Sequence, residues 1–189
     1  MFYKNKQIFV DQGKQNYDKE NIKYNFPEFH NSIEISNSNY FNINNEKNFF
    51  KKFIQSSPIN YVTKSKKNMI LNFSSNKKIG SYSRKFNLKK NCLSISDCAK
   101  LNIKKNLILN FFLTNNLKLI KGNNQIILKY KNENIIFSIN TNNEYKIKLT
   151  KKINSKDFEK YGDKVEFQRI QLIFTNMKDL NLNIKVLFG

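Results

Sequence analysis

The period of the hydrophobic pattern changes at Leu117. From Leu117 to Leu149 the sequence LKLIKGNNQIILKYKNENIIFSINTNNEYKIKL alternates apolar and polar residues. The alternation is interrupted at Gly-Asn-Asn, Asn-Glu-Asn and Thr-Asn-Asn-Glu, which are residue types that favour turns. Alternation places successive side chains on opposite faces of a strand. The segment therefore predicts three or four antiparallel strands.

Segments on either side of this region predict further elements. MILNF (69–73) and FQRIQLIFTN (167–176) have strand character, and a basic connection is expected over 74–91. The closing segment DLNLNIKVLFG is compatible with a helix or a last strand. Two helices are expected because apolar residues recur at helical spacing. The first is short and contains Phe49, Phe50, Phe53 and Ile54; the second covers 99–115, with Leu101, Ile103, Leu107, Ile108, Phe111 and Phe112 on one face.

Taken together, these elements predict an α+β fold, with an antiparallel sheet and helices packed on one of its faces. Residues 1–48 are polar, rich in Asn and balanced in charge, and they contain Pro27. Such a composition is typical of a segment that is loosely structured alone and becomes ordered against a partner. We expect a polar N-terminal extension over 1–48 and a basic α+β domain over 49–189.

The charge of the chain points to a polyanionic partner. There are 34 Lys and Arg against 14 Asp and Glu, which gives a formal net charge of +20. Residues 1–48 hold six Lys and six acidic residues, so the remaining 28 cations and 8 anions, and the whole excess, lie in 49–189. An excess of this size exceeds what solubility requires. A nucleic acid is the expected partner, and RNA is preferred because no recognition-helix motif appears.

The use of residue types also indicates an origin. Asn occurs 33 times and Ala once, and 32 of the 34 cations are Lys. The preferred residues have A/T-rich codons, which indicates an AT-rich gene such as those of organelles. No segment resembles a signal peptide, a transit helix or a membrane span. Cys92 and Cys98 lack zinc-site spacing, which favours two free thiols in a reducing compartment.

The sequence offers little support for enzymatic chemistry. His30 is the one histidine, and no nucleophile or carboxylate pair lies near it in sequence. No phosphate-binding loop, dinucleotide fingerprint, zinc motif or nucleophile elbow is present. Asp157, Glu159 and Asp163 cluster, but neighbouring lysines are their expected partners. We therefore predict a protein that is not an enzyme and that needs no cofactor or metal.

The order of elements resembles one known family, the bacterial-type L-five protein of the large ribosomal subunit. FFKKFIQSSPINYVTKSKKNMILNFSSN resembles the helix, linker and first strand of that family, and Asn72 falls on its asparagine. Phe112-Leu113-Thr114-Asn115 resembles the end of its next helix. Asp163-Lys164-Val165 followed by IQLIFT (170–175) resembles its last strand. The resemblance covers roughly 48–189.

This resemblance implies a structural constituent of an organellar large ribosomal subunit, in the central protuberance. Its expected partners are large-subunit rRNA, 5S rRNA where that molecule is retained, the peptidyl-site tRNA, the small-subunit head and neighbouring ribosomal proteins. The expected location is the mitochondrial matrix, as an organelle-encoded protein, with a plastid less favoured. The implied rRNA-binding residues are Asn72, Ser74, Ser75, Lys77, Lys78, Arg84 and Lys85, and the implied tRNA-facing hairpin carries Lys121, Gly122, Lys129 and Lys131.

Two alternatives stay open on the sequence alone. One is another divergent organellar ribosomal protein. The other is a basic accessory subunit of a mitochondrial respiratory complex, whose cationic face would lie against acidic neighbours or cardiolipin. The ribosomal assignment depends on the predicted helix 99–115 packing on a sheet that contains both 69–73 and 170–175.

Overall fold

The structure is a computed structural model, and it describes residues 2–3, 6–10, 31, 33–36, 59–64, 68–74, 80–89, 91–154 and 166–189. Within these ranges the regular structure consists of strands, and the predicted α+β fold is wrong. The strands are β1 (Phe2–Tyr3), β2 (Lys6–Gln7), β3 (Ile33–Ile35), β4 (Ile59–Lys64), β5 (Asn68–Ser74), β6 (Gly80–Lys89), β7 (Cys92–Thr114), β8 (Lys118–Gly122), β9 (Gln125–Tyr130), β10 (Glu133–Asn140), β11 (Lys146–Asn154) and β12 (Glu166–Phe188).

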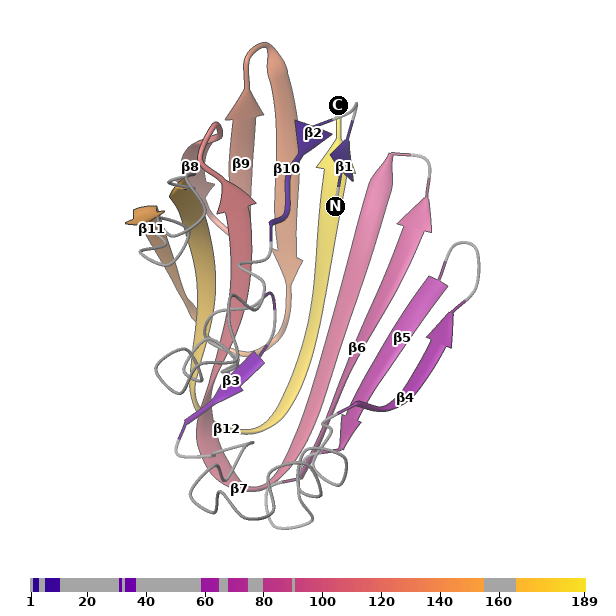
Figure 1. The fold of residues 1–189 in the computed structure, drawn as a ribbon. Helices are drawn as coiled ribbons and strands as arrows, with labels where there is room; N and C mark the ends of the chain where they lie inside the picture. Colours follow the sequence, from indigo (N-terminus) through magenta and orange to yellow (C-terminus); the bar gives the residue numbers. More distant parts are fainter. Residues whose placement is uncertain are drawn as a thin grey trace, which may run out of the picture.

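Two long strands, β7 and β12, organise the fold. They run antiparallel along almost their whole length, and their register shifts between Phe174 and Asp179. At this point both strands bend, so that their two halves belong to opposite layers of a sandwich (Figure 1). The bend contains Asn176 in a left-handed conformation, with φ of 57°. The backbone N–H of Asn176 donates to Oδ1 of Asn106 at 2.9 Å, which ties the two bends together.

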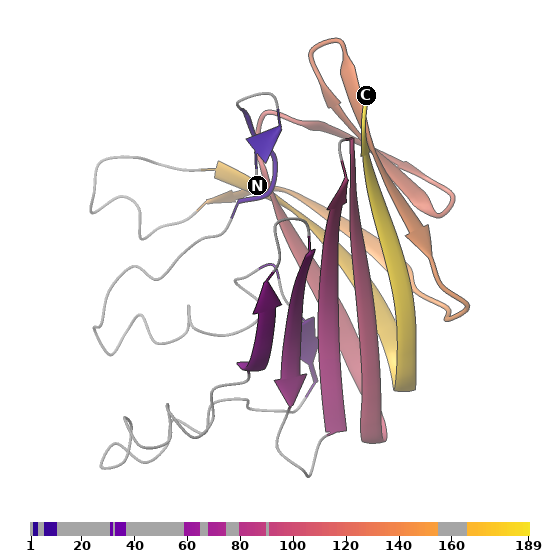
Figure 2. The ribbon, with the colours of Figure 1, turned by 90° about the vertical axis from the view of Figure 1, so that its right-hand side faces the viewer.

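The two layers are called the major sheet and the minor sheet. The major sheet has the order β4-β5-β6-β7-β12-β10-β9-β8 and uses residues 92–101 of β7 and 179–188 of β12. The minor sheet is built on residues 107–114 of β7 and 166–174 of β12, with β3 paired to β7 and β11 paired to β12. Figure 2 shows the broad face of the major sheet turned toward the viewer. Neighbouring strands in both layers are antiparallel.

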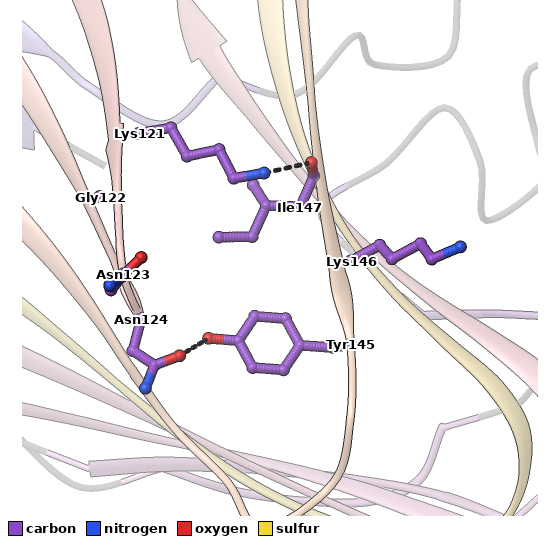
Figure 3. A pocket seen from close by; sticks show the side chains of 7 residues that line it. All are labelled: Lys121, Gly122, Asn123, Asn124, Tyr145, Lys146 and Ile147. Carbon is purple, nitrogen blue, oxygen red and sulfur yellow. Dashed lines mark hydrogen bonds between the residues drawn. The ribbon is translucent and has the colours of Figure 1, made fainter.

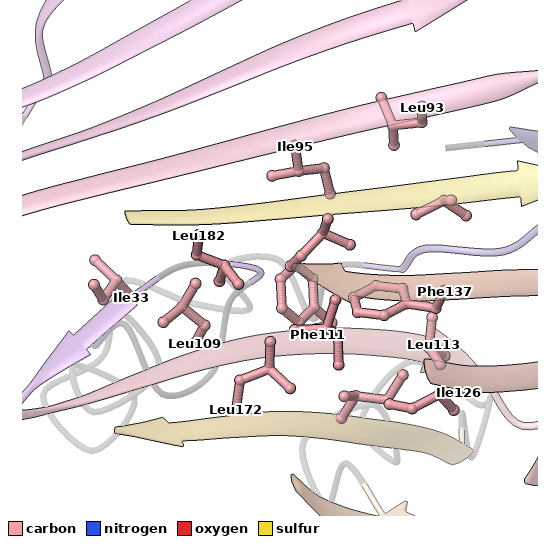
Figure 4. Packing of buried hydrophobic residues seen from close by; sticks show 14 of the residues in the cluster. Ile33, Leu93, Ile95, Leu109, Phe111, Leu113, Ile126, Phe137, Leu172 and Leu182 are labelled. Carbon is pink, nitrogen blue, oxygen red and sulfur yellow. The ribbon is translucent and has the colours of Figure 1, made fainter. Parts of the chain in front are cut away.

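The hydrophobic core lies between the two layers (Figure 4). Phe111 of the minor sheet and Phe137 of the major sheet meet edge to face, with ring centroids 5.1 Å apart. Such aromatic pairs add to the free energy gained by burying apolar surface. The inward residues alternate along each strand, as in the burial of Leu107, Leu109, Phe111 and Leu113 on β7. One contiguous core therefore joins both sheets.

The predicted helix over 99–115 is the main correction, because this segment is the centre of β7. Phe111 faces the core between the sheets, while Phe112 is buried on the opposite face of the minor sheet with Val10 and Phe167. A strand buried on both faces reads as a continuous apolar run, and periodicity cannot distinguish such a run from a helix. Residues 102–106 fall at the bend. Ile103, the one apolar residue among them, occurs at a spacing that made the apolar face of the predicted helix look continuous.

One further prediction is corrected. The basic connection expected over 74–91 contains β6, a ten-residue strand. In the predicted N-terminal extension, the described residues pair with the sandwich: β3 pairs with β7, and the backbone N–H of Val10 donates to the carbonyl of Phe112 at 3.0 Å. Ile8, Ile33 and Ile35 lie in the core. The polar composition of 1–48 hid these few apolar residues. The short helix predicted at Phe49 lies outside the described residues.

Several strand predictions are confirmed. The segment 69–73 lies within β5, and the alternating region from Leu117 forms β8, β9, β10 and the start of β11. FQRIQLIFTN lies within β12, and the closing segment continues the same strand rather than forming a helix. Cys92 and Cys98 are free thiols, as expected.

Candidate polyanion-binding surface and groove

From β6 across to β8, the outer face of the major sheet carries six exposed lysines. Outward residues alternate with core residues along β6, the first half of β7 and the second half of β12. Ser96 and Asn183 are opposite each other on this face, and the Ser96 hydroxyl donates to Oδ1 of Asn183 at 2.7 Å. We call this surface the lysine face; its charged members are Lys85, Lys89, Lys100, Lys118, Lys129, Lys185 and Asp179.

The lysine face extends across six strands. Lys85 and Lys89 lie on β6, and Lys118 and Lys129 are directly opposed at the far side, on β8 and β9. With strands about 4.8 Å apart, five strand steps separate these pairs by roughly 24 Å. Asp179, its one described acidic residue, is opposite Lys100. Cations spread over this distance can contact several charges of a linear polyanion at once.

The lysine face also has an apolar row. Ile120, Ile127, Ile136 and Leu187 are successive neighbours across β8, β9, β10 and β12. Leu187 is 41% exposed, and the three isoleucines are half-buried. Cross-strand pairs of this kind stabilise a sheet. Among the side chains that the structure describes, no Phe or Tyr is exposed, so this face has no aromatic surface on which bases could stack.

A groove opens between the edge strands of the two sheets, where β8 of the major sheet faces β11 of the minor sheet. Its volume is about 570 Å³, and seven residues line it: Lys121, Gly122, Asn123, Asn124, Tyr145, Lys146 and Ile147 (Figure 3). The turn between β8 and β9 forms one wall, since Asn123 and Asn124 connect Gly122 to Gln125. Asn124 has a φ of 53°, a conformation that Asn tolerates better than most residues.

Two side chains reach across the groove from opposite walls. Nζ of Lys121 donates to the carbonyl of Ile147 at 3.4 Å, and the hydroxyl of Tyr145 donates to Oδ1 of Asn124 at 2.8 Å (Figure 3). The Tyr145 ring packs on Phe174, with centroids 5.6 Å apart. Burial raises the pKa of the Tyr145 hydroxyl above its ordinary value. The side chain of Lys146 points away from the groove (Figure 3).

A smaller hollow of about 210 Å³ lies on the same side of the sandwich, lined by Asn115, Leu117, Lys118, Leu119, Lys151, Glu166 and Gln168. The amide of Gln168 donates to the carbonyls of Asn115 and Leu117 at 2.7 and 2.6 Å. These bonds close the turn before β8. Because Glu166 lies among its lining residues, this hollow is less suited to an anion than the groove.

A buried polar network lies between β6 and β7, on the core side of the major sheet. Nε and one terminal nitrogen of Arg84 donate to the two oxygens of Asp97 at 2.6 and 3.0 Å, and Tyr82 donates to the same carboxylate. The second terminal nitrogen donates to the carbonyl of Asn31 at 2.8 Å. Burial lowers the pKa of Arg84, but attraction to Asp97 and Tyr82 and the hydrogen bonds outweigh it and raise that pKa.

The predicted rRNA-binding residues are not brought together as one described surface. Asn72 and Ser74 lie in β5, opposite Ser83 and Ser81, and Lys85 belongs to the lysine face. Arg84 is only 2% exposed and holds Asp97, so it faces the core rather than a phosphate backbone. Alternation along β6 explains the difference between these adjacent cations. Ser75, Lys77 and Lys78 lie outside the described residues.

The predicted tRNA-facing hairpin is divided among three places. Lys121 and Gly122 line the groove, and Lys129 lies on the lysine face opposite Lys118. Lys131 sits at the next turn with a φ of 50°, and its Nζ is 5.9 Å from the centre of the Tyr130 ring. Sequence reasoning missed Tyr145 and Asn124, because the two Asn-rich breaks were interpreted only as turns. Nothing in the sequence indicated that these turns meet in space.

Within the described ranges, no group of three or more His, Cys, Asp and Glu side chains is placed to hold a metal ion. In the same ranges no helix has the length and apolarity needed to cross a membrane. His30, Asp157, Glu159 and Asp163 lie outside the described residues.

Comparisons with known proteins identify a fold but no family. No family model matches the chain, and no curated protein matches it. Among solved structures, a heparinase III is similar with a TM-score of 0.66 and 14% identity over 97% of this chain. A second heparinase III, with methylated lysines, has a TM-score of 0.68 and 10% identity over 99%. The heparan sulfate lyase HepC from Pedobacter heparinus has a TM-score of 0.65 and 13% identity over 100%.

The chain spans only 28% to 30% of the length of these enzymes. At such low identity the likeness establishes a shared β-sandwich architecture alone.

Proposed function

We propose that this sandwich is a non-catalytic module that binds a linear polyanion, and that the polyanion is an acidic polysaccharide. The observation that carries the proposal is the lysine face, with six exposed lysines against one aspartate on a single sheet surface. Neutralising a polyanion releases its condensed counterions, which favours binding at low salt. A face about 24 Å across suits an extended chain rather than a small molecule.

Two further observations favour a polysaccharide over a single-stranded nucleic acid. Proteins that bind single-stranded RNA stack bases on exposed aromatic side chains, and none of the described side chains is of that kind. The similar structures are heparinases, one of which is a heparan sulfate lyase. Heparan sulfate carries both sulfate and carboxylate groups, which lysines can contact as point charges.

The ribosomal assignment is a second candidate, and the concentration of positive charge in 49–189 favours it. The resemblance to the L-five family required a helix over 99–115, and that segment is a strand. What supports this candidate is therefore the charge, together with the codon bias that indicates an organellar gene. Binding to large-subunit rRNA and location in the mitochondrial matrix stay predictions of this candidate.

A binding titration separates the two. Fluorescently labelled heparin and an RNA duplex of equal charge are titrated with the purified chain at several salt concentrations. The polysaccharide proposal expects tighter binding to heparin and a steep fall in affinity with salt. Lys85→Gln with Lys185→Gln should weaken binding and flatten the salt dependence, because both lysines lie on the lysine face.

The matched control is Lys104→Gln with Lys178→Gln. It removes the same charge from exposed positions at the bend of β7 and β12. Equal losses of heparin affinity in both double variants would show that net charge alone drives binding, and would overturn the proposed role of the lysine face. Preference for the RNA duplex would favour the ribosomal candidate. Fractionation of organelle lysate on sucrose gradients at high and low magnesium would then show whether the protein follows the large subunit.

A further inference from the structure

The groove between β8 and β11 has the chemistry of a binding site for one anionic sugar unit. Its volume of about 570 Å³ lies within the range of ligand pockets in proteins. The seven described residues that line it include no carboxylate, and of their two lysines only Lys121 extends across it (Figure 3). The groove therefore presents a single positive charge to a ligand.

The cation in the groove retains hydrogen-bonding capacity. A lysine ammonium has three donors, and the one bond that the structure assigns to Lys121 is a long one, at 3.4 Å to the Ile147 carbonyl. An incoming sulfate or carboxylate would accept shorter, charge-assisted hydrogen bonds from the same nitrogen. Lys121 is therefore held at the groove by a contact that a ligand can displace at little cost.

The wall that carries Lys121 also carries Asn123 and Asn124, and together with Tyr145 on the opposite wall it supplies groups that match sugar hydroxyls. Because the Tyr145 hydroxyl donates a hydrogen bond to Oδ1 of Asn124, the amide nitrogen of Asn124 remains as a donor and the phenolic oxygen remains as an acceptor. The side chain of Asn123 lies at the same wall as Asn124 (Figure 3). The Tyr145 ring packs against Phe174 and borders the groove as an apolar surface.

We propose that this groove binds a single uronate or sulfated sugar unit, with its anionic group on Lys121, its ring beside Tyr145 and its hydroxyls on Asn123 and Asn124. The inference rests on the proposed function in one respect, since such a unit would belong to the same acidic polysaccharide. It adds a site distinct from the lysine face, between the edge strands β8 and β11. The lysine face holds the polymer by charge, and the groove selects the sugar unit.

The test uses the full chain and a sulfated disaccharide prepared from heparin, which is too short to span the lysine face. Isothermal titration measures its affinity, and NMR of labelled protein identifies the residues that respond. Binding is expected to shift the resonances of 122–124 and 145–147. Lys121→Gln is expected to weaken disaccharide binding at least five-fold, and Tyr145→Phe two- to three-fold.

Lys131→Gln is the control, because it removes an exposed cation from the next turn of the same hairpin region. It should leave disaccharide affinity unchanged, and thermal unfolding should show that all three variants fold. If the wild-type protein binds long heparin but not the disaccharide, the groove is not a sugar-binding site, and the proposed function still stands. Failure to bind either one would overturn both. Disaccharide binding that is equal in Lys121→Gln and wild type would also overturn the groove.

Discussion

Arg84 on β6 and Asp97 on β7 are directly opposed inside the sandwich, with Nε of Arg84 2.6 Å from Oδ1 of Asp97. Both side chains are almost fully buried, and Tyr82 and Asn31 occupy further hydrogen-bonding groups of the pair. The guanidinium also lies 5.2 Å from the centre of the Phe111 ring in the other sheet. A pair of opposite charges therefore connects the two layers and the N-terminal segment.

Asp97→Asn should strongly destabilise the fold, because it leaves the Arg84 charge buried without its counterion. The expected loss in free energy of unfolding is about 3–5 kcal/mol. Urea denaturation measures it. Lys85→Gln, at the neighbouring exposed position, should change stability by no more than about 0.5 kcal/mol. A loss below about 1 kcal/mol in Asp97→Asn would mean that the carboxylate does not hold the guanidinium in solution.

Asn31→Ala should detach the N-terminal segment from the minor sheet. Oδ1 of Asn31 accepts from the backbone N–H of Phe112 at 2.7 Å, and its amide donates to the carbonyl of Val10. Losing both bonds leaves buried backbone groups unpaired, and each such group costs roughly 1–3 kcal/mol. The measurement is urea denaturation together with hydrogen exchange at Phe112. Unchanged protection at Phe112 would show that another group satisfies it.

Tyr145 should make stability fall at high pH. Its pKa is raised in the folded protein by burial, so the folded state keeps the phenolic proton more tightly than the unfolded chain does. The contribution is complete below the ordinary tyrosine pKa of about 10 and is lost as pH rises through the folded value. The stability difference between wild type and Tyr145→Phe should be flat up to that pH and then move against wild type. A difference that stays constant to higher pH would contradict the raised pKa.

Gly80, the first residue of β6, and Gly122, the last residue of β8, should respond differently to alanine. Gly80 has a φ of 128°, and an added Cβ would lie 2.1 Å from the carbonyl oxygen of Lys100 on β7. At Gly122 the nearest atom would be the flexible Cγ of Gln125, at 3.1 Å. Gly80→Ala should therefore cost well over about 1 kcal/mol, and Gly122→Ala less than about 1 kcal/mol. Thermal unfolding compares the two, and similar losses would contradict the close approach of β6 to β7.

How much of this fold the sequence could predict depended on how many faces of a strand are buried. The region from Leu117 has one face in the core and one outside, so its alternation predicted β8 to β10 correctly. In β7 the residues around Phe111 and Phe112 are buried on both faces, which removed the alternation and made a helix the natural prediction. The N-terminal residues Ile8 and Ile33 were missed because each lies in a short segment that pairs with a strand far away in the sequence.

The candidate site was less predictable than the fold. Local sequence marked Lys121 as basic, but the groove depends on Tyr145, 24 positions later, reaching Asn124. Likewise Arg84 and Lys85 are adjacent cations with opposite roles, and only the phase of β6 assigns one to the core and the other to the lysine face. A shift of one residue in strand phase exchanges the two faces. Composition could therefore suggest a polyanionic partner, but not which lysines share one face of the sheet.

A paired substitution tests the strand assignment of β7 directly. On a helix over 99–115, Ile103 and Phe111 would share one apolar face, so truncating either would open the core. In the structure Phe111 is buried against Phe137, whereas Ile103 is 56% exposed at the bend. Phe111→Ala should cost about 3–5 kcal/mol and Ile103→Ala no more than about 0.5 kcal/mol in urea denaturation. Comparable losses at the two positions would favour the helix and with it the ribosomal resemblance.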